Sequence, residues 1–320
     1  ITGLDISDRS IKYLQFSSYE KPDFVCFGEI SVPSGFILNG DILRGDNLTA
    51  MLKDWVSKDG RRLRHSAIVA SLPEEKSFIR LIQVPKIKKD EVANAIRWEI
   101  EANIPFPADQ LDYDYEIIEP LEDHLDHLDV LITAFPKETI NSYVKVLTDS
   151  GLQPLVLEHE AQAMVRSLVP NLRDRTAKII VDMGRTRTSF IICSGGSISF
   201  TSTINLGGKI LEDNLARVLE ISPEEAFQIK KEIGMNRRQY EGKVFSALAP
   251  VIAVLADELK RTVAYYQSHP MHMHGASPEI SEILLTGGDA LLFGLDTYLA
   301  SALKVPVNMG NPLSSVSKFI

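Results

Sequence analysis

Ile-Thr-Gly-Leu-Asp-Ile-Ser-Asp-Arg-Ser-Ile-Lys at residues 1–12 and Ile-Val-Asp-Met-Gly-Arg-Thr-Arg-Thr-Ser at residues 180–189 are two versions of one short pattern. Each runs a hydrophobic strand into an aspartate and a tight polar turn, and a second strand leaves the turn at once. When Asp5 is aligned with Asp182, Ser7 falls on Gly184 and Ser10 on Arg187. The repeat predicts two halves of one chain that present matching turns to one ligand, an arrangement that suits a phosphate chain with its metal ion.

The residue types in these turns are those that a triphosphate requires. Binding needs inward-pointing backbone N–H groups, hydroxyl donors, and carboxylates that hold Mg²⁺ through its waters. The turns supply these types as Asp5, Ser7 and Ser10 in the first, and Asp182, Gly184, Thr186 and Thr188 in the second. A single turn of this kind is typical of ordinary hairpins. The duplication favours a phosphate site.

Composition excludes several classes of protein. A chain of 320 residues with 44% hydrophobic content has material for two packed cores. Its net charge of −9 argues against a nucleic-acid partner, which would attract clustered Lys and Arg. The two cysteines, Cys26 and Cys193, lie in apolar runs and are expected to be buried free thiols of a cytoplasmic protein. No apolar run is long enough to span a bilayer, so any membrane association is expected to be peripheral.

Hydrophobic periodicity divides the first half of the chain into a mixed α/β domain and an inserted lobe. The domain opens with a three-stranded meander over residues 1–32, followed by a helix over residues 46–58 and a strand over residues 66–72. Residues 77–136 then follow a strand, helix, strand, strand pattern. The apolar stripe on the lobe helix is interpreted as core rather than as a partner groove, and consists of Val92, Ala95, Ile96 and Ile100.

The second half repeats the opening and adds helices. A helix over residues 136–150, a strand over 152–157 and a helix over 158–168 return the chain to the first domain. Residues 178–204 form a second meander, and a strand over 282–286 leads through two glycines into a helix with Asp289 as its N-cap. We therefore predict a two-domain α/β fold, with a first domain of residues 1–76 and 137–175, an inserted lobe of 77–136, a second domain of 176–206 and 276–320, and a helical sub-lobe of 207–275.

Two further features are candidates for nucleotide chemistry. The pairs Gly207-Gly208 and Gly287-Gly288 each precede a helix, where glycine permits close approach to a base or ribose; a plain turn into a helix is the alternative. Glu160 is a candidate to orient water toward a γ-phosphate. The alternative is that Glu158 and Glu160 complement the helix dipole.

Other patterns carry less weight. His269, His272 and His274 have no neighbouring Cys or carboxylate ligand and are interpreted as a surface loop, and the acidic run over residues 122–127 as a solvated turn. The chain has neither a Gly-x-x-x-x-Gly-Lys-Ser phosphate loop nor a Gly-x-Ser-x-Gly elbow. These nucleotide-binding and hydrolase classes are excluded.

The order of these features resembles the actin-like ATPase superfamily and, within it, the PilM family of type IV pilus assembly proteins, relatives of FtsA. The most specific stretch is Ala95-Ile96-Arg97-Trp98-Glu99-Ile100-Glu101 followed by Ile104-Pro105-Phe106-Pro107. Residues similar to the family's also occur at 135–138, 152–163, 206–208 and 311–312. The resemblance covers nearly the whole chain and implies a two-domain actin-like fold with an SHS2-like inserted lobe of the FtsA/PilM type.

The resemblance implies ATP and Mg²⁺ as cofactors and a role for each candidate residue. Asp5 and Asp182 would hold the metal's waters. Phosphate would be met by Ser7, Ser10 and Lys12 on one side and by Gly184, Thr186, Arg187 and Thr188 on the other, and the nucleoside by Gly207, Gly208, Gly287 and Gly288. At Ser7 and Asp8 the family usually has Gly and then Ser. Asp8 would add negative charge beside the γ-phosphate, which Arg185 and Arg187 would offset.

The function that the resemblance implies is an ATP-binding scaffold of pilus assembly at the cytoplasmic face of the inner membrane. Its partner would be the N-terminal tail of a PilN-like membrane protein, held in a groove beside the inserted lobe. Contacts with other inner-membrane platform components and homo-oligomers are also expected, and nucleotide binding is expected ahead of turnover by a weak ATPase with Glu160 as its catalytic residue.

Two alternatives remain open. An FtsA-like filament protein would need a terminal amphipathic helix, which residues 311–320 do not form. A small-molecule kinase on the same fold would need a base for its acceptor, and no aspartate is evident at a second substrate site.

Overall fold

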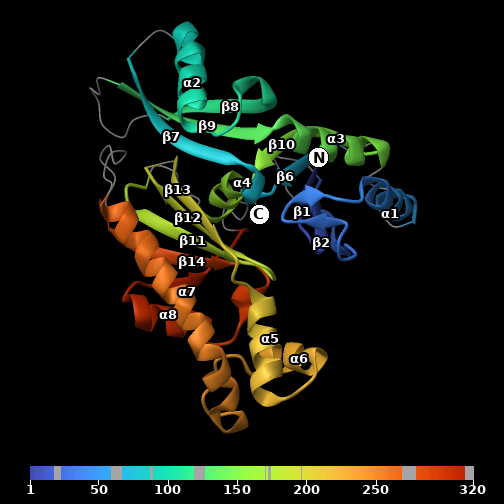
Figure 1. The fold of residues 1–320 in the computed structure, drawn as a ribbon, viewed down its shortest axis with the longest axis vertical. Helices are drawn as coiled ribbons and strands as arrows, with labels where there is room; N and C mark the ends of the chain where they lie inside the picture. Colours follow the sequence, from blue (N-terminus) through green and yellow to red (C-terminus); the bar gives the residue numbers. More distant parts are fainter. Residues whose placement is uncertain are drawn as a thin grey trace. The chain divides into compact units, whose positions relative to one another are not determined.

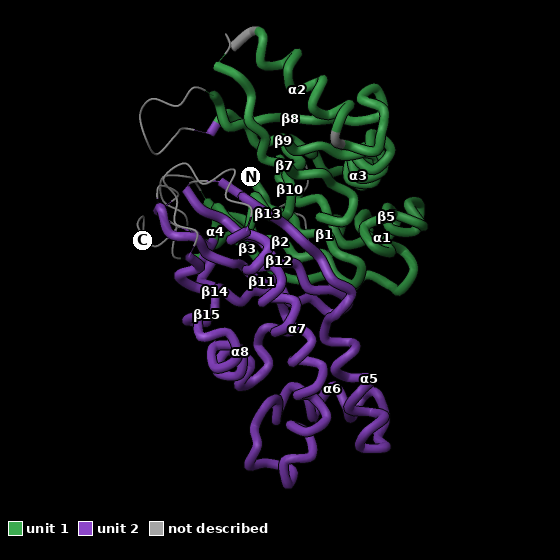
Figure 2. The backbone as a smooth tube through the Cα atoms, turned by 60° about the vertical axis from the view of Figure 1, so that its left-hand side comes forward, with its two compact units in different colours: residues 1–117, 126–167, 313–320 green, residues 118–125, 168–312 purple. Residues whose placement is uncertain are grey.

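The computed structural model describes residues 1–17, 23–58, 67–86, 89–118, 127–169, 171, 174–195, 197–268 and 279–313. These residues belong to two compact units, coloured green and purple in Figure 2. The first unit takes residues 1–117, 126–167 and 313–320, and the second takes 118–125 and 168–312. Each unit has its own five-stranded sheet and its own hydrophobic core.

The sheet of the first unit has the strand order β10-β6-β1-β2-β3, and Figure 1 labels its strands β10, β6, β1 and β2. Its strands are β1 (Thr2–Ile6), β2 (Ser10–Phe16), β3 (Phe24–Ser31), β6 (Ala67–Leu72) and β10 (Gln153–His159). The first three form the predicted antiparallel meander, whereas β6 pairs parallel with β1 and β10 parallel with β6. The carboxyl ends of β1, β6 and β10 therefore meet at one edge of the sheet.

Two helices, α1 (Gly45–Lys58) and α3 (Lys137–Asp149), share a hydrophobic core with this sheet. Leu48 and Leu52 of α1 and Leu147 of α3 are each at most 1% exposed. Burying each such side chain contributes about 1.5–3 kcal/mol, so the helices are held mainly by these apolar faces. The short hairpin of β4 (Ile37–Leu38) and β5 (Asp41–Ile42) precedes α1, and α4 (Glu160–Leu168) follows β10.

The inserted lobe lies between β6 and α3 in the sequence and has its own core. Its sheet has the order β7-β9-β8. The elements are η1 (Glu74–Lys76), β7 (Phe78–Pro85), α2 (Lys89–Asn103), η2 (Ala108–Gln110), β8 (Leu111–Ile118) and β9 (His127–Pro136). Val92, Ile96 and Ile100 of α2 are at most 1% exposed, which confirms that the apolar stripe of this helix is core.

The second unit repeats the arrangement of the first sheet. Its order is β13-β12-β11-β14-β15, so a meander of three strands is again extended by two parallel strands beyond the first one. The strands are β11 (Ala177–Met183), β12 (Thr188–Ser194), β13 (Ser197–Ile204), β14 (Ile280–Thr286) and β15 (Val307–Met309). The duplicated sequence pattern is therefore a duplicated sheet topology.

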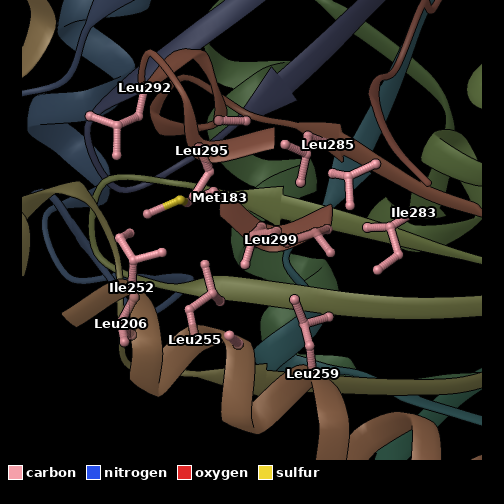
Figure 3. Packing of buried hydrophobic residues seen from close by; sticks show 14 of the residues in the cluster. Met183, Leu206, Ile252, Leu255, Leu259, Ile283, Leu285, Leu292, Leu295 and Leu299 are labelled. Atoms are coloured by element: carbon pink, nitrogen blue, oxygen red, sulfur yellow. The ribbon is translucent and has the colours of Figure 1, made fainter. Parts of the chain in front are cut away.

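Helices complete the second unit. They are α5 (Gly208–Leu219), α6 (Pro223–Ile233), η3 (Tyr240–Gly242), α7 (Lys243–Ser268), η5 (Asp289–Leu291) and α8 (Leu295–Leu303). Figure 3 shows Leu255 and Leu259 extending from α7 into the core that also contains Met183 and Leu299. Helix α6 begins with a capping box, in which Ser222 and Glu225 exchange reciprocal hydrogen bonds. No helix among the described residues has the length and apolar character needed to cross a membrane.

Three expectations from the sequence need correction. Asp289 does not cap a long helix: it begins the single turn η5, and α8 starts only after Gly294, whose φ of 77° breaks the helical path. Glu158 belongs to β10 rather than to the following helix, since its register continues along β6. Both cysteines are free, but only Cys193 is buried, because Cys26 lies half-exposed on the end strand β3. The His269–His274 cluster and residues 122–126 lie outside the described residues.

Candidate functional site

Asp5 is the penultimate residue of β1 and lies at the edge where the parallel strands end. Its register partners are Lys12 on β2 and Ser71 on β6. Lys12 Nζ lies 3.3 Å from Asp5 Oδ2, and Ser71 Oγ donates to Asp5 Oδ1 over 3.3 Å. The carboxylate is 45% exposed, so it is oriented from both sides while it remains open to solvent.

The turn after Asp5 is closed by Ser7. Its backbone N–H and its hydroxyl both donate to Ser10 O over 2.9 Å, and its Oγ accepts from Ser10 N–H at 3.3 Å. A serine therefore stabilises the turn at the position that corresponds to Gly184 in the repeat. Asp5, Ser7, Ser10, Lys12 and Ser71 are called the first half-site below.

Asp8 does not point its charge at this half-site. It is 7% exposed, and its carboxylate accepts the backbone N–H of Asn39 at 2.9 Å and that of Gly40 at 3.1 Å. Tyr143 Oη donates to Gly40 O over 2.9 Å, and burial, with a contribution from Asp8, raises the pKa of this tyrosine. The additional aspartate thus fixes the loop that precedes α1.

The register of the sheet brings Glu160 to the same edge as Asp5. Asp5 pairs with Ser71, and Ser71 pairs with Glu158 on β10. Glu160 then begins α4, two residues beyond that row, whereas Glu158 forms an ion pair with Arg166. Of the two acidic residues considered in the sequence, only Glu160 occupies the first turn of the helix.

Asp182 occupies the equivalent position in the second unit. It is the penultimate residue of β11, and its register partners are Ser189 on β12 and Thr286 on β14. Gly287 follows with a φ of 89°, and a Cβ on it would lie 2.6 Å from Asp182 Oδ1 and 2.5 Å from Met183 O. The close approach and the backbone conformation both require glycine there.

The turn after Asp182 is joined to the start of α5 through backbone groups. Gly184 N–H donates to Arg187 O at 2.9 Å, and Gly208 N–H donates to Gly184 O at 3.1 Å. A Cβ on Gly207 would meet Gly184 O at 2.5 Å, and one on Gly208 would meet the Asp289 carboxylate at about 2 Å. Asp182, Gly184, Gly207, Gly208 and Gly287 are called the second half-site below.

Gly288 differs from Gly207, Gly208 and Gly287 of the second half-site. It has helical dihedral angles of φ −65° and ψ −37°, and a Cβ built on it meets no atom of the chain within 4 Å. Neither packing nor conformation requires glycine at this position.

The sequence did not reveal a buried ion network beside the second half-site. Lys230 Nζ lies 2.7 Å from Glu212 Oε1 and also pairs with Asp289. Arg185 forks onto Glu212, with Nη1 to Oε1 at 3.0 Å and Nη2 to Oε2 at 2.8 Å. The side chains of Lys230, Glu212 and Asp289 are 7, 5 and 13% exposed, so the network joins α5, α6 and η5 away from water. One sequence signal was available, since Lys230 falls four residues after the buried Ala226 on the inner face of α6.

The remaining predicted residues of the second turn divide by environment. Thr186 is exposed at the tip of the turn, and Arg187 is half-buried. Thr188 is fully buried and donates to Leu206 O over 2.6 Å, so we assign it a structural role in closing the meander. Arg185 is committed to the Glu212 carboxylate.

A groove of about 570 Å³ lies between α5 and α7, and its lining includes Ile210, Val218 and Val254. Its walls are mostly apolar and contain neither aspartate of the repeat. The chemistry of the two half-sites therefore identifies the candidate site better than the volume of this groove does. Their carboxylates are the hard oxygen donors that Mg²⁺ prefers, and their glycines permit the close backbone approach that phosphate requires.

Comparison with known proteins places this geometry in context. The family model for type IV pilus assembly protein PilM matches residues 3–318. The cell shape-determining protein Mbl of Bacillus cereus is 24% identical over 194 residues, which are 52% of this chain and 58% of Mbl. The chain thus spans little more than half the length of this curated relative.

Two solved structures are similar over almost the entire chain. The PilM-PilN type IV pilus biogenesis complex matches with a TM-score of 0.81 and 25% identity, covering 98% of this chain and 89% of the other. MreB5 of Spiroplasma citri bound to AMPPNP matches with a TM-score of 0.56 and 13% identity, covering 99% and 93%, which is a likeness of fold alone. The chain therefore belongs to the PilM family of type IV pilus assembly proteins and has the actin-like ATPase fold.

Proposed function

We propose that this protein is an ATP-binding scaffold of type IV pilus assembly that docks the N-terminal tail of a PilN-like membrane protein. The observation that carries the nucleotide proposal is the duplicated half-site. Asp5 and Asp182 occupy equivalent positions in two sheets of equivalent topology, and Gly287 packs against the second aspartate. The fold relative MreB5 was solved with AMPPNP, and the PilM relative was solved with PilN, which supports both parts of the proposal.

In this proposal the residues of the two half-sites bind Mg-ATP. Mg²⁺ would neutralise phosphate charge, and Asp5 and Asp182 would hold it through its waters. Phosphate oxygens would be met by Ser7, Ser10 and Lys12 of the first half-site and by Gly184, Thr186 and Arg187 of the second turn. Gly207, Gly208, Gly287 and Gly288 would line the nucleoside, with Lys230 and Glu212 behind them.

Hydrolysis is a separate proposal from binding. Glu160 would orient the attacking water from the first turn of α4, since it lies just beyond the strand row that holds Asp5. Replacing Glu160 by Ala should therefore abolish any turnover while the affinity for Mg-ATP stays within about twofold.

The partner proposal follows the family. The tail would dock in a groove beside the inserted lobe, which we assign to residues 77–136, and the scaffold would thereby lie at the cytoplasmic face of the inner membrane. The remaining boundaries are those predicted from the sequence: residues 1–76 and 137–175, 176–206 and 276–320, and the helical sub-lobe 207–275. Contacts with other platform components and homo-oligomers belong to the same proposal.

Gly288→Ala is a direct test of the nucleoside assignment. Because the chain leaves room for a Cβ and the backbone is helical, the substitution should not lower stability. If the nucleoside lies against Gly288, the affinity for Mg-ATP should fall at least about tenfold by calorimetry, since tenfold is 1.4 kcal/mol of lost contact. Gly45→Ala, where a Cβ would make ordinary contacts at 3.7 Å, is the matched control.

If the Mg-ATP affinity of Gly288→Ala is unchanged, the nucleoside does not contact Gly288.

Titration of a synthetic PilN-like tail peptide into the protein tests the partner separately. Absence of peptide binding, both with and without Mg-ATP, would overturn the scaffold proposal even if nucleotide binds.

A further inference from the structure

His159 is a fully buried histidine at the junction of β10 and α4, with both ring nitrogens engaged. Its Nδ1 accepts the backbone N–H of Ala161 at 3.0 Å, which caps the first turn of α4. Its Nε2 lies 2.5 Å from Ser77 Oγ. The ring also packs against Phe135, with 5.9 Å between ring centroids.

These contacts determine where the protons lie. A backbone N–H can only donate, so Nδ1 must be unprotonated, and the neutral ring carries its proton on Nε2. Nε2–H then donates to Ser77 Oγ, and the serine hydroxyl donates onward to Glu74 O over 2.7 Å. One arrangement of protons therefore makes every hydrogen bond in the series from Ala161 N–H to Glu74 O. The imidazolium form would turn Nδ1 into a donor and break the cap.

The two other partners of His159 lie at the root of the inserted lobe. Ser77 directly precedes β7, and Phe135 lies near the end of β9. The adjacent residues Phe78 and Ala134 face each other as the first pair of the β7–β9 ladder. His159 therefore contacts the residue that leads into the first strand of the lobe and also the strand that leaves the lobe, and the next residue in the chain is Glu160.

We propose that His159 is a positioning residue that couples the inserted lobe to the first turn of α4, which lies at the same sheet edge as Asp5 of the first half-site. Displacement of the β7–β9 root would move Ser77, and the short bonded path would carry that displacement to the cap of α4. Occupation of the lobe by a partner and occupation of the half-sites by nucleotide would then influence each other's affinity, reciprocally. This inference rests on the proposed function, because it requires a ligand at each end of the path.

Ser77→Ala tests the path with the least disturbance. It removes the bond from the lobe root to His159, whereas the cap from His159 to Ala161 stays intact. The measurement is the ratio of the Kd for the PilN-like tail peptide without and with Mg-ATP. In the wild type this ratio should be either above about 5 or below about one fifth, because allosteric coupling between two sites is typically at least fivefold. In Ser77→Ala the ratio should come within about twofold of one, while each ligand alone keeps its affinity.

Three further variants show whether Ser77→Ala changes the coupling between peptide and nucleotide binding or only loosens the packing. Ser142→Ala removes a serine hydroxyl that bonds its own helix at Glu138 O, and it should keep the wild-type ratio. Ser77→Thr keeps the hydroxyl on extended backbone, φ −110° and ψ 161°, and should restore the ratio. His159→Asn retains an N-capping oxygen but is too short to reach Ser77, so it should reproduce the effect of Ser77→Ala.

The outcomes distinguish this inference from the proposed function. If both ligands bind the wild type and the ratio is already one, or if Ser77→Ala keeps the wild-type ratio, the coupling role of His159 is overturned while the scaffold proposal stands. If the wild type binds neither ligand, the proposed function itself fails. Loss of nucleotide binding alone in Ser77→Ala would contradict the inference and indicate a merely structural role.

Discussion

Asp8 has a buried carboxylate that stabilises a nearby loop by accepting hydrogen bonds from the backbone N–H groups of Asn39 and Gly40. Asp8→Ala leaves both donors without their partner, and hydrogen bonds to charged groups are worth about 1.5–3 kcal/mol each. We expect the free energy of unfolding to fall by about 3 kcal/mol in urea titrations, with the affinity for Mg-ATP changed little among folded molecules. Asp23→Ala, at an exposed position of the same unit, is the control.

The opposite result would restore the electrostatic interpretation of Asp8. If its charge opposed a γ-phosphate, Asp8→Ala would strengthen nucleotide binding and leave stability unchanged. That outcome would mean that the carboxylate is not committed to the loop in the nucleotide-bound protein.

His159 makes stability sensitive to acid. Burial lowers its pKa to about 4, whereas in the unfolded chain a histidine titrates near 6.5. Between these values the unfolded chain binds a proton that the folded one does not, so stability is complete above pH ~6.5 and is lost as the pH falls toward 4. The loss from this group should approach 3 kcal/mol, since each unit of pKa shift is about 1.4 kcal/mol.

The measurement for His159 is the free energy of unfolding at pH 7 and at pH 4.5. His159→Asn lacks the titrating ring, so its pH dependence should be shallower than that of the wild type even if its stability at pH 7 is lower. Parallel pH profiles for the two proteins would contradict the assignment of a neutral buried ring.

At the scale of elements, Lys230 holds α5, α6 and η5 together through Glu212 and Asp289. Lys230→Met keeps the length of the side chain but leaves two buried carboxylates without that cation. Removing one partner from such a network costs about 3–5 kcal/mol. Chemical denaturation should show a loss of this size, while Lys231→Met, at the exposed neighbouring position, should change stability by less than about 0.5 kcal/mol. A small effect in Lys230→Met would show that Arg185 alone compensates Glu212.

Elements with a strong period could be predicted from the sequence, and contacts between distant charges could not. The meanders and the stripe of α2 follow from residues that face one side at period two or 3.6, a local property. The break between η5 and α8 depends on Gly294 and on the bond of Met235 N–H to Phe293 O, which joins segments far apart in the sequence. The sequence predicted Asp8 beside a γ-phosphate and gave Lys230 no role, since only the folded chain supplies the partners that bury these two charges. The candidate aspartates were identified because the repeat itself is visible in the sequence.

For the whole molecule, the repeat corresponds to two sheets with the same strand topology, whose turns after Asp5 and Asp182 differ in their residues. The second turn has Gly184, with its N–H bonded to Arg187 O, and lies against Gly207 and Gly287. The first has Ser7, whose hydroxyl already bonds the turn, and a cation, Lys12, beside its aspartate. The first half-site thus has an ion pair and serine hydroxyls where the second has glycines that permit close approach. We expect the two half-sites to contribute differently to nucleotide binding.

Hydrogen exchange with and without saturating Mg-ATP measures that difference across both units at once. At a ligand concentration of about 100 Kd, binding stabilises the folded state by about 2.7 kcal/mol, and the protection appears where the ligand closes local openings. If both half-sites bind, amides of residues 6–10 and of residues 183–188 should both exchange more slowly. In Asp182→Asn protection should weaken in residues 183–188, whereas Asp54→Asn on the exposed side of α1 should keep the full pattern. Protection of the second turn alone would mean that Ser7 and its turn no longer contact the triphosphate, and that nucleotide is held by the second unit.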